Sequence, residues 1–347
     1  MKEAYLYSNV QGKVRCTACN RYCLLGKGQT GFCGIRKNID GRLFLLSYGR
    51  AATLAIDPIE KKPLYHYLPG GRVLSLSSSG CNWSCSYCQN YEISQRREIM
   101  GEYLTPEEIV KIAMNGGADG ISYTYNEPTI FAEYAHDIGI LARKHNIFST
   151  FVSNGYESEE AVPYLSEFLD AISIDFKGNG NDTFGRKYIG ILSYTPVFDT
   201  LKRLKNAGIY TEVTDLVVPV KGIGDNQEDA RTLSRWIRDN LGSDTPLHFT
   251  RFHPDYRMRD VPATPVETLE RHHAIAKEEG LKFVYIGNVP GHPLENTYCP
   301  NCGNELVRRY GFQIKKYEIT PEGRCPFCGQ DMHIVRRRPV EQHPLRE

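Results

Sequence analysis

The middle of the chain, from Val73 to about Asn288, alternates short apolar runs with longer segments in which apolar residues recur every three or four positions. Short runs rich in β-branched residues predict buried strands, and the periodic segments predict amphipathic helices. The predicted strands cover residues 73–76, 120–124, 149–153, 171–176, 211–218, 247–252 and 283–286. Because strand and helix alternate about six times, we expect an α/β fold with a parallel sheet, partly or fully closed into a β/α barrel.

Three of the predicted helices share one start signal, a threonine followed by a proline. These pairs begin at Thr105, Thr195 and Thr264, and threonine at the N-cap with proline at the first helical position is a favourable helix start. Thr105 also has Glu108 three residues later, which predicts a capping box. A further helix is predicted within residues 128–145, where the apolar side chains share one face.

The sequence changes character on both sides of this region, which divides the chain into four parts. We expect a four-cysteine metal-binding segment in residues 1–50 and an extended linker, with prolines and mixed charges, in residues 51–71. The barrel is expected in residues 72–290. Residues 291–347 are expected to form a zinc-ribbon-like domain with a basic tail that includes Arg336, Arg337 and Arg338.

The overall composition excludes several classes of partner. A length of 347 residues leaves room for one barrel-sized core and smaller additions. The formal net charge of +1 gives no electrostatic footprint for nucleic acid or for an anionic membrane, so we expect neither as a partner. The sequence contains no run of about 18 apolar residues and no basic-then-apolar signal pattern. We therefore expect a cytoplasmic protein.

The candidate chemistry is concentrated in eleven cysteines, which fall into three groups with none left over. Close C-x2-C pairs in a reducing compartment suit metals better than disulfides. The central group, Cys81, Cys85 and Cys88, forms a C-x3-C-x2-C array just after the first predicted strand. Three thiolates on one loop can ligate three irons of a [4Fe–4S] cluster, which usually takes four cysteines, and this leaves one iron open to a small molecule. The alternative is three buried or zinc-bound cysteines.

The other two groups lie near the chain ends, and each supplies four thiolates. The N-terminal cysteines have the spacing C-x2-C-x3-C-x9-C, which fits either a closed structural zinc site or an auxiliary iron–sulfur cluster. They are Cys16, Cys19, Cys23 and Cys33. The ribbon cysteines form two C-P-x-C-G knuckles around a predicted hairpin, as in a zinc ribbon, although rubredoxin-type iron uses the same knuckle. They are Cys299, Cys302, Cys325 and Cys328.

Polar residues follow several other predicted strands, where the reactive groups of β/α barrels lie. They are Asn126 and Glu127 after the second strand, Ser153 and Asn154 after the third, Asp175 and Lys177 after the fourth, and His253 after the sixth. Each has a structural alternative: Glu127 can be a helix N-terminal carboxylate, and Asp175 with Lys177 can be a simple ion pair. Polar groups at four strand ends above the same cysteine loop favour a site.

The cysteine loop, with Tyr87 before the third cysteine, resembles the C-x3-C-x-aromatic-C signature of the radical S-adenosylmethionine (SAM) superfamily. The whole chain is similar to the radical SAM protein of the AmmeMemoRadiSam system, a relative of the pyruvate formate-lyase activating enzymes. The stretches that carry this resemblance are the N-terminal cysteines with Gly-Phe-Cys-Gly, residues 57–64, 80–90, 123–128 and 251–256, and the paired C-P-x-C-G knuckles.

The resemblance implies the partial β/α barrel of that superfamily, a [4Fe–4S] cluster on Cys81, Cys85 and Cys88, and SAM on the open iron. It places Tyr87 against the adenine and Asn126–Glu127 where activating enzymes have Gly-Gly-Glu, so that Glu127 holds the SAM amine. Ser153 and Asn154 are small polar groups able to reach the ribose or the carboxylate. Asp175 and Lys177 match an Asp-x-Lys pair that contacts the ribose and carboxylate, and His253 matches a histidine beside SAM.

Two departures from the activating enzymes bear on function. Tyr125 and Asn126 replace the two glycines of Gly-Gly-Glu, and the ferredoxin-like insertion expected soon after Cys88 is absent. These departures weaken glycyl-radical activation, so we expect a radical SAM enzyme that cleaves SAM reductively and abstracts hydrogen from an unidentified substrate. The alternative is an activase that installs a glycyl radical on a protein. A lower alternative is an iron–sulfur electron carrier or a zinc-ribbon nucleic-acid module.

The expected partners follow from this hypothesis. An electron donor such as ferredoxin or flavodoxin is needed, and the family resemblance implies Memo-like and AMMECR-like proteins. The sequence assigns no catalytic residue beyond the cluster and SAM site.

Overall fold

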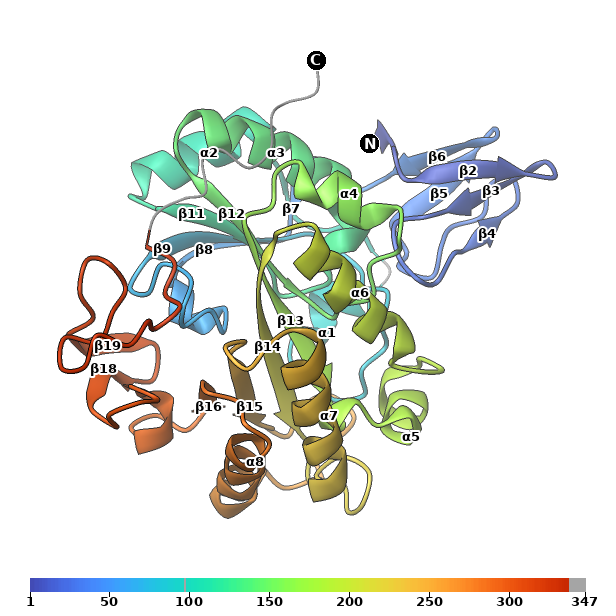
Figure 1. Cartoon of the computed structure of the whole chain (residues 1–347). Coiled ribbons are helices and arrows are strands. Elements are labelled where there is room, and N and C mark those ends of the chain that lie inside the picture. The colour runs from blue at the N-terminus through green and yellow to red at the C-terminus, as the bar shows by residue number, and fades with distance from the viewer. Residues whose placement is uncertain (97, 337–347) are drawn as a thin grey trace.

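A computed structural model describes residues 1–96 and 98–336 of the chain. Strands and helices alternate through its middle, and short antiparallel strands lie at both ends (Figure 1). The strands of the central sheet are β8 (Thr53–Pro58), β9 (Arg72–Ser77), β11 (Gly120–Tyr123), β12 (Phe148–Ser153), β13 (Ala171–Lys177), β14 (Tyr210–Val217), β15 (Leu247–Arg251) and β16 (Val284–Gly287). The helices are α1 (Tyr91–Ser94), α2 (Pro106–Asn115), α3 (Ala132–Lys144), α4 (Ala161–Ser166), α5 (Asp182–Phe184), α6 (Thr195–Asn206), α7 (Gln227–Asn240) and α8 (Val266–Glu278).

The central sheet follows the order β16-β15-β14-β13-β12-β11-β9-β8, with β8 antiparallel to β9 and every other neighbouring pair parallel. Strands β8 and β16 end this order, so the sheet is a partial barrel. The helices that connect the strands cover its outer side (Figure 1). Strands such as β11 and β12 are therefore buried on both faces, which explains why they appear in the sequence as continuous apolar runs. All seven predicted strands, and the α/β fold class, are confirmed.

Residues 51–71, expected to be a linker, contain a strand and pack into the fold. Strand β8 pairs with β9 along its whole length, from Thr53 opposite Ser77 to Pro58 opposite Arg72. The proline is tolerated because it lies at the end of an edge strand. The expectation of a linker was wrong here because prolines and charges also mark sheet edges.

The threonine–proline start signal is confirmed at one of its three positions. Thr105 caps α2 with a complete capping box to Glu108. At α6 the N-cap is Tyr194 and Thr195 is already helical, while at α8 the N-cap is Pro265. The hydroxyl of Thr264 instead donates to the carbonyl of Val217 and accepts the N–H of Phe252, so it joins two strand ends.

Both cysteine-rich ends are small β structures packed on the barrel. The N-terminal part has two three-stranded sheets, formed by β1 (Lys2–Glu3), β6 (Arg42–Leu45) and β5 (Arg36–Ile39), and by β2 (Tyr7–Val10), β3 (Lys13–Cys16) and β4 (Leu24–Leu25). Strand β7 (Arg50–Ala51) pairs with β10 (Glu102–Tyr103). The C-terminal ribbon consists of β17 (Thr297–Tyr298), β18 (Glu305–Tyr310) and β19 (Gln313–Tyr317), which confirms the predicted hairpin.

The two ends lie on different sides of the central sheet (Figure 1). Of the predicted basic tail, Arg337 and Arg338 lie outside the described residues. No helix in the described part of the chain is long and apolar enough to cross a membrane.

Candidate active site

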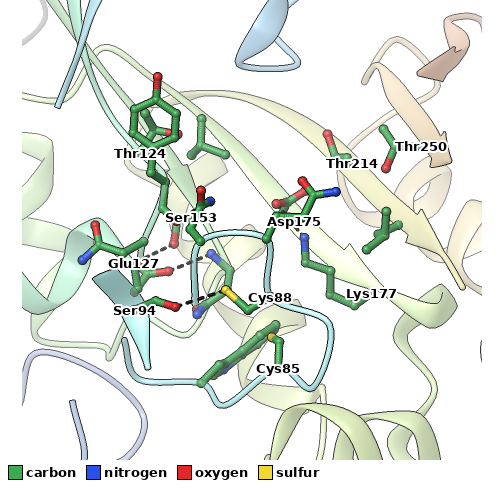
Figure 2. A pocket seen from close by; sticks show the side chains of 18 of the residues that line it. Cys85, Cys88, Ser94, Thr124, Glu127, Ser153, Asp175, Lys177, Thr214 and Thr250 are labelled. Atoms are coloured by element: carbon green, nitrogen blue, oxygen red, sulfur yellow. Dashed lines mark hydrogen bonds and ion pairs between the residues drawn. The ribbon is translucent and has the colours of Figure 1, made fainter. Parts of the chain in front are cut away.

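The central cysteine loop, residues 81–88, directly follows β9. Because parallel strands bring their carboxyl ends to one edge of the sheet, this loop meets the ends of the neighbouring strands there. A cavity of about 480 Å³ opens at this edge, and it is lined by all three cysteines of the loop. Side chains from the ends of β11 to β15 complete its wall, among them Glu127, Ser153, Asp175, Thr214 and Thr250 (Figure 2).

The three thiols are held in low-dielectric surroundings. Burial raises the pKa of Cys85 to about 12 and raises that of Cys81 well above its ordinary value. The N–H of Trp83 donates to Cys81 Sγ at 3.4 Å, and Cys88 Sγ lies 3.1 Å from Ser94 Oγ. Thiolates are the form that binds metal, so a bound cation has to supply the charge compensation that this environment lacks.

Glu127 lies at the end of β11 with a second buried acid, Glu157, close behind it. Glu127 accepts hydrogen bonds from the N–H groups of Thr129 at 3.0 Å and Asn154 at 2.8 Å. Ser153 Oγ lies 2.9 Å from Glu127 Oε1 and 2.5 Å from Glu157 Oε1. One hydroxyl proton cannot be donated fully to both carboxylates, which favours a proton on one of these acids. Burial, and then the Glu157 carboxyl, raises the pKa of Glu127.

The sequence analysis does not identify Glu157 as a residue of the site. It lies in the polar run Tyr156-Glu157-Ser158-Glu159-Glu160, which has the composition of an exposed turn, yet its side chain is fully buried. Its backbone forms a bridge with Cys19 and accepts the side-chain amide of Asn20. Glu157 therefore connects the N-terminal cysteines to the acid at the cavity.

The two asparagines predicted for the site support the cysteine loop. Asn126 Nδ2 donates to the carbonyl of Gly80 at 2.9 Å, and Asn154 Nδ2 donates to Asn82 Oδ1 at 2.7 Å. Both also line the cavity. Their contacts fix the loop against the ends of β11 and β12.

Opposite Glu127, Asp175 and Lys177 project from β13 and form an ion pair at 2.7 Å (Figure 2). Burial lowers the pKa of Lys177, but the Asp175 carboxylate outweighs this effect and the resulting pKa is raised, so the amine keeps its charge. Tyr87, within the cysteine loop, is buried and packs against Phe252, with the two ring centroids 5.8 Å apart. His253 is exposed and lines the same cavity.

Two neighbouring lysines at the cavity wall, Lys61 and Lys62, are also not identified as site residues by the sequence analysis. Asp57 binds both Lys61 and Lys62 at 2.8 Å and accepts the hydroxyl of Tyr125 at 2.7 Å. Lys62 is almost fully buried, and burial lowers its pKa to about 8. Both lysines line the cavity, as does Phe312 from the ribbon hairpin. The charged stretch that suggested a linker in the sequence therefore supplies part of the site.

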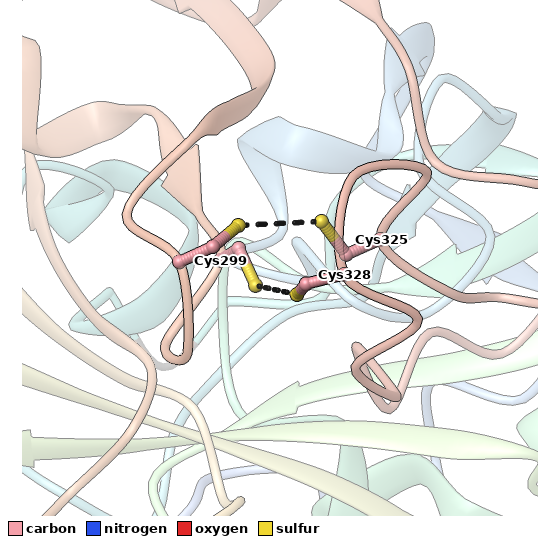
Figure 3. A group of neighbouring side chains, drawn as sticks. Cys299, Cys325 and Cys328 are labelled. Atoms are coloured by element: carbon pink, nitrogen blue, oxygen red, sulfur yellow. Dashed lines mark hydrogen bonds between the residues drawn. The ribbon is translucent and has the colours of Figure 1, made fainter.

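The ribbon cysteines converge as predicted. Cys299 Sγ lies 3.5 Å from Cys328 Sγ, and Cys302 Sγ lies 3.6 Å from Cys325 Sγ (Figure 3). Four sulfurs about 2.3 Å from one zinc in a tetrahedron are roughly 3.8 Å apart, so the group fits a single metal ion. The N-terminal cysteines line a separate, smaller cavity together with Arg36 and Asn82.

Comparison with known proteins identifies the fold family. Residues 75–233 match the family model of the Radical SAM superfamily. An uncharacterised protein of Methanocaldococcus jannaschii is 48% identical over 339 residues, which cover 96% of this chain and 100% of that protein. The chain belongs to the radical SAM superfamily.

More distant likenesses are shorter. A cysteine-type anaerobic sulfatase-maturating enzyme of Clostridium perfringens is 30% identical over 122 residues, which cover 31% of this chain and 33% of that enzyme. The solved structure of Streptococcus suis SuiB bound to S-adenosylmethionine has a TM-score of 0.49 and 13% identity, with 70% of this chain and 56% of that chain covered. A domain of the pyruvate-formate lyase-activating enzyme of Bacteroides vulgatus has a TM-score of 0.40 and 14% identity, with 49% of this chain and 100% of that chain covered.

This radical SAM protein is an enzyme, and its superfamily implies SAM and a [4Fe–4S] cluster. The residues fit both groups. Three thiols line one cavity, whose volume exceeds the space that a single metal ion needs. The same cavity presents the Glu127 carboxyl and the Lys177 ammonium, which match the amine and the carboxylate of an amino-acid moiety.

Proposed function

We propose that this radical SAM enzyme binds a [4Fe–4S] cluster through Cys81, Cys85 and Cys88 and uses SAM to abstract hydrogen from an unidentified substrate. The observation that carries the proposal is that one cavity holds all three cysteines of the loop together with Glu127 and the Asp175–Lys177 pair. Bound there, the reduced cluster supplies the electron that splits SAM into methionine and a 5′-deoxyadenosyl radical.

The chain's own residues bind and orient SAM in this proposal. Glu127, deprotonated when a cation approaches, accepts the SAM ammonium, and Lys177 donates to the SAM carboxylate. Asp175 accepts a ribose hydroxyl, and the buried ring of Tyr87 packs against the adenine. Asn126, Ser153 and Asn154 hold Glu127 and the cysteine loop in place through the hydrogen bonds described above. His253 also lines the cavity, where it would lie beside SAM.

The wider context of the enzyme is proposed from its resemblance to the AmmeMemoRadiSam radical SAM proteins. We place it with Memo-like and AMMECR-like partners and with a one-electron donor of the ferredoxin or flavodoxin class. Hydrogen abstraction from a substrate enclosed by the barrel is favoured over glycyl-radical activation, because the ferredoxin-like insertion expected soon after Cys88 in the activating enzymes is absent from the sequence.

The test is anaerobic EPR spectroscopy of the reduced, reconstituted protein with and without SAM, with product analysis on the same sample. We expect SAM to change the cluster signal and 5′-deoxyadenosine to form. The Cys85→Ala variant should lose both responses, while Cys302→Ser, in the ribbon, should keep them. An unchanged signal with no SAM cleavage in the wild-type protein would favour an electron carrier instead.

A further inference from the structure

The N-terminal cysteines and the ribbon cysteines differ in how closely their sulfurs approach, although both are sets of four. In the described part of the chain, the ribbon cysteines are the one group in which three or more ligand atoms all lie within 4.8 Å of one another. The N-terminal sulfurs are more widely spaced, yet all four residues line one cavity. A single tetrahedral zinc requires sulfurs roughly 3.8 Å apart, whereas a cluster with a separate iron for each cysteine holds them further apart.

An unpartnered donor lies in the wall of the same cavity. Asn82 is 1% exposed, and no hydrogen-bond partner is found among the described residues for its Nδ2. Leaving a buried amide N–H unpaired is destabilising. The inorganic sulfides of an iron–sulfur cluster accept such hydrogen bonds, and those bonds tune its potential. A mononuclear zinc site provides no sulfide for this donor.

The cavity also contains a buried cation. Arg36 is 1% exposed and lines the cavity, and its guanidinium binds the Glu133 carboxylate at 3.0 Å and the carbonyl of Ile130 at 2.8 Å. A cluster ligated by four thiolates is anionic, so a fixed positive charge beside it is favourable.

The N-terminal cysteines lie directly against the central cysteine loop. Gly80, the residue before Cys81, is packed so closely on the carbonyl of Cys33 that an added Cβ would lie 2.1 Å from that oxygen. Arg21 Nε donates to the carbonyl of Asn82 at 2.8 Å. Asn82, which follows Cys81, thus belongs to the N-terminal cavity while Cys81 belongs to the central one.

We infer that the N-terminal cysteines bind an iron–sulfur cluster that passes single electrons to the cluster on the central loop. A donor of the flavodoxin or ferredoxin class reduces the N-terminal cluster by one electron. That electron then moves to the central cluster, so the N-terminal cluster returns to its oxidised state and one electron is delivered per SAM cleaved. The relay rests on the proposed function, whereas the presence of the cluster does not.

The presence of the cluster is tested in the full-length Cys81→Ala/Cys85→Ala/Cys88→Ala variant, prepared anaerobically, by iron, acid-labile sulfide and zinc analysis and by EPR after reduction. We expect iron and sulfide at roughly half the wild-type content, about one zinc per chain, and an EPR signal that SAM does not change. A variant that holds about two zinc ions and no iron or sulfide would overturn the assignment. Since this variant cannot bind SAM at a cluster, the result does not depend on the proposed function.

Two further variants separate the sites and test the relay. Cys302→Ser should lose zinc and keep all iron, and Cys19→Ser/Cys23→Ser should lose the SAM-independent signal and keep the central one. In the latter, reduction of the central cluster by flavodoxin should slow at least tenfold, while reduction by a small viologen should be unchanged. An unchanged rate with flavodoxin would overturn the relay. If Cys19→Ser/Cys23→Ser does not fold, Asn82→Leu provides a second test, because it removes the amide donor. We expect this variant to shift the reduction potential of the SAM-independent signal. An unchanged potential would contradict a hydrogen bond from Asn82 to the N-terminal cluster.

Discussion

Glu127 combines two properties that are costly together, full burial and an acidic side chain. Its carboxyl has a serine hydroxyl, two backbone N–H groups and a neighbouring acid around it, and no basic side chain among its hydrogen-bond partners in the described residues. A buried carboxylate without a neighbouring cation is destabilising, and a bound cationic ligand can offset that cost. The sequence could locate Glu127 because it follows a strand, but not Glu157, because burial of a charged run depends on the long-range contact with Cys19.

The first prediction concerns this acid. Glu127→Gln preserves the shape of the side chain but removes the negative charge, so SAM binding to the cluster-loaded enzyme should weaken roughly ten- to a hundredfold. Equilibrium binding measured by the SAM-dependent change in the EPR signal reports this. Glu159→Gln, whose side chain is 79% exposed, is the matched control and should bind like the wild type. Equal affinities in both variants would remove Glu127 from the SAM site.

Among the elements, the strands of the barrel could be predicted from sequence, while their attachments could not. Burial of parallel strands on both faces produces long apolar runs that need no tertiary information to recognise. Strand β8 has no such run, since it is an edge strand with one neighbour and carries Asp57, which binds two lysines at the cavity. Thr195 and Thr264 are not N-caps, because tertiary contacts outweigh the local preference for threonine at that position. The hydroxyl of Thr264 donates instead to the carbonyl of Val217, at the end of a strand.

The second prediction tests the contact between the N-terminal segment and the cysteine loop. Gly80 and Gly41 both have left-handed backbones, with φ of +80° and +86°, but a Cβ at Gly80 meets the carbonyl of Cys33 whereas a Cβ at Gly41 meets nothing within 4 Å. Gly41→Ala should therefore cost only about 1–2 kcal/mol of backbone strain. Gly80→Ala should cost clearly more and reduce the iron content, because it pushes the loop away from the N-terminal cysteines.

Urea unfolding of the anaerobically loaded proteins, followed by circular dichroism and paired with iron analysis, distinguishes the two variants. If Gly80→Ala and Gly41→Ala unfold at the same urea concentration with equal iron content, the backbone contact between the two segments does not support the loop.

At the scale of the whole molecule, a buried polar network joins the barrel to the ribbon. His66 Nε2 lies 2.6 Å from the hydroxyl of Tyr285 on β16, and its Nδ1 lies 3.0 Å from the carbonyl of Met332 in the ribbon. Glu212 on β14 accepts the N–H of His66 at 2.7 Å and lies 2.8 Å from His248. The sequence indicated two separate metal-binding ends but could not show this junction, since its members lie far apart along the chain.

The third prediction follows from the protonation of His66. Burial lowers its pKa from 6.5 to about 4, so the unfolded chain binds a proton more tightly than the folded one. The contribution of neutral His66 to stability is therefore complete above pH 6.5 and is lost as the pH falls from there towards 4. Between about pH 7.5 and about pH 5 this loss amounts to roughly 2 kcal/mol.

His66→Gln keeps a polar side chain at the junction, but glutamine does not bind a proton in this pH range. As the pH is lowered from about 7.5 to about 5, the unfolding free energy of the variant should therefore fall by roughly 2 kcal/mol less than that of the wild type. His333→Gln, at a half-exposed histidine of the ribbon, should follow the wild-type profile. Urea unfolding at both pH values measures the difference.

Parallel pH profiles for wild type and His66→Gln would mean that the junction admits a proton or water, and the ribbon would then be only loosely attached to the barrel. A steeper wild-type profile would mean that His66 stays enclosed between the barrel and the ribbon, whose hairpin places Phe312 at the wall of the central cavity.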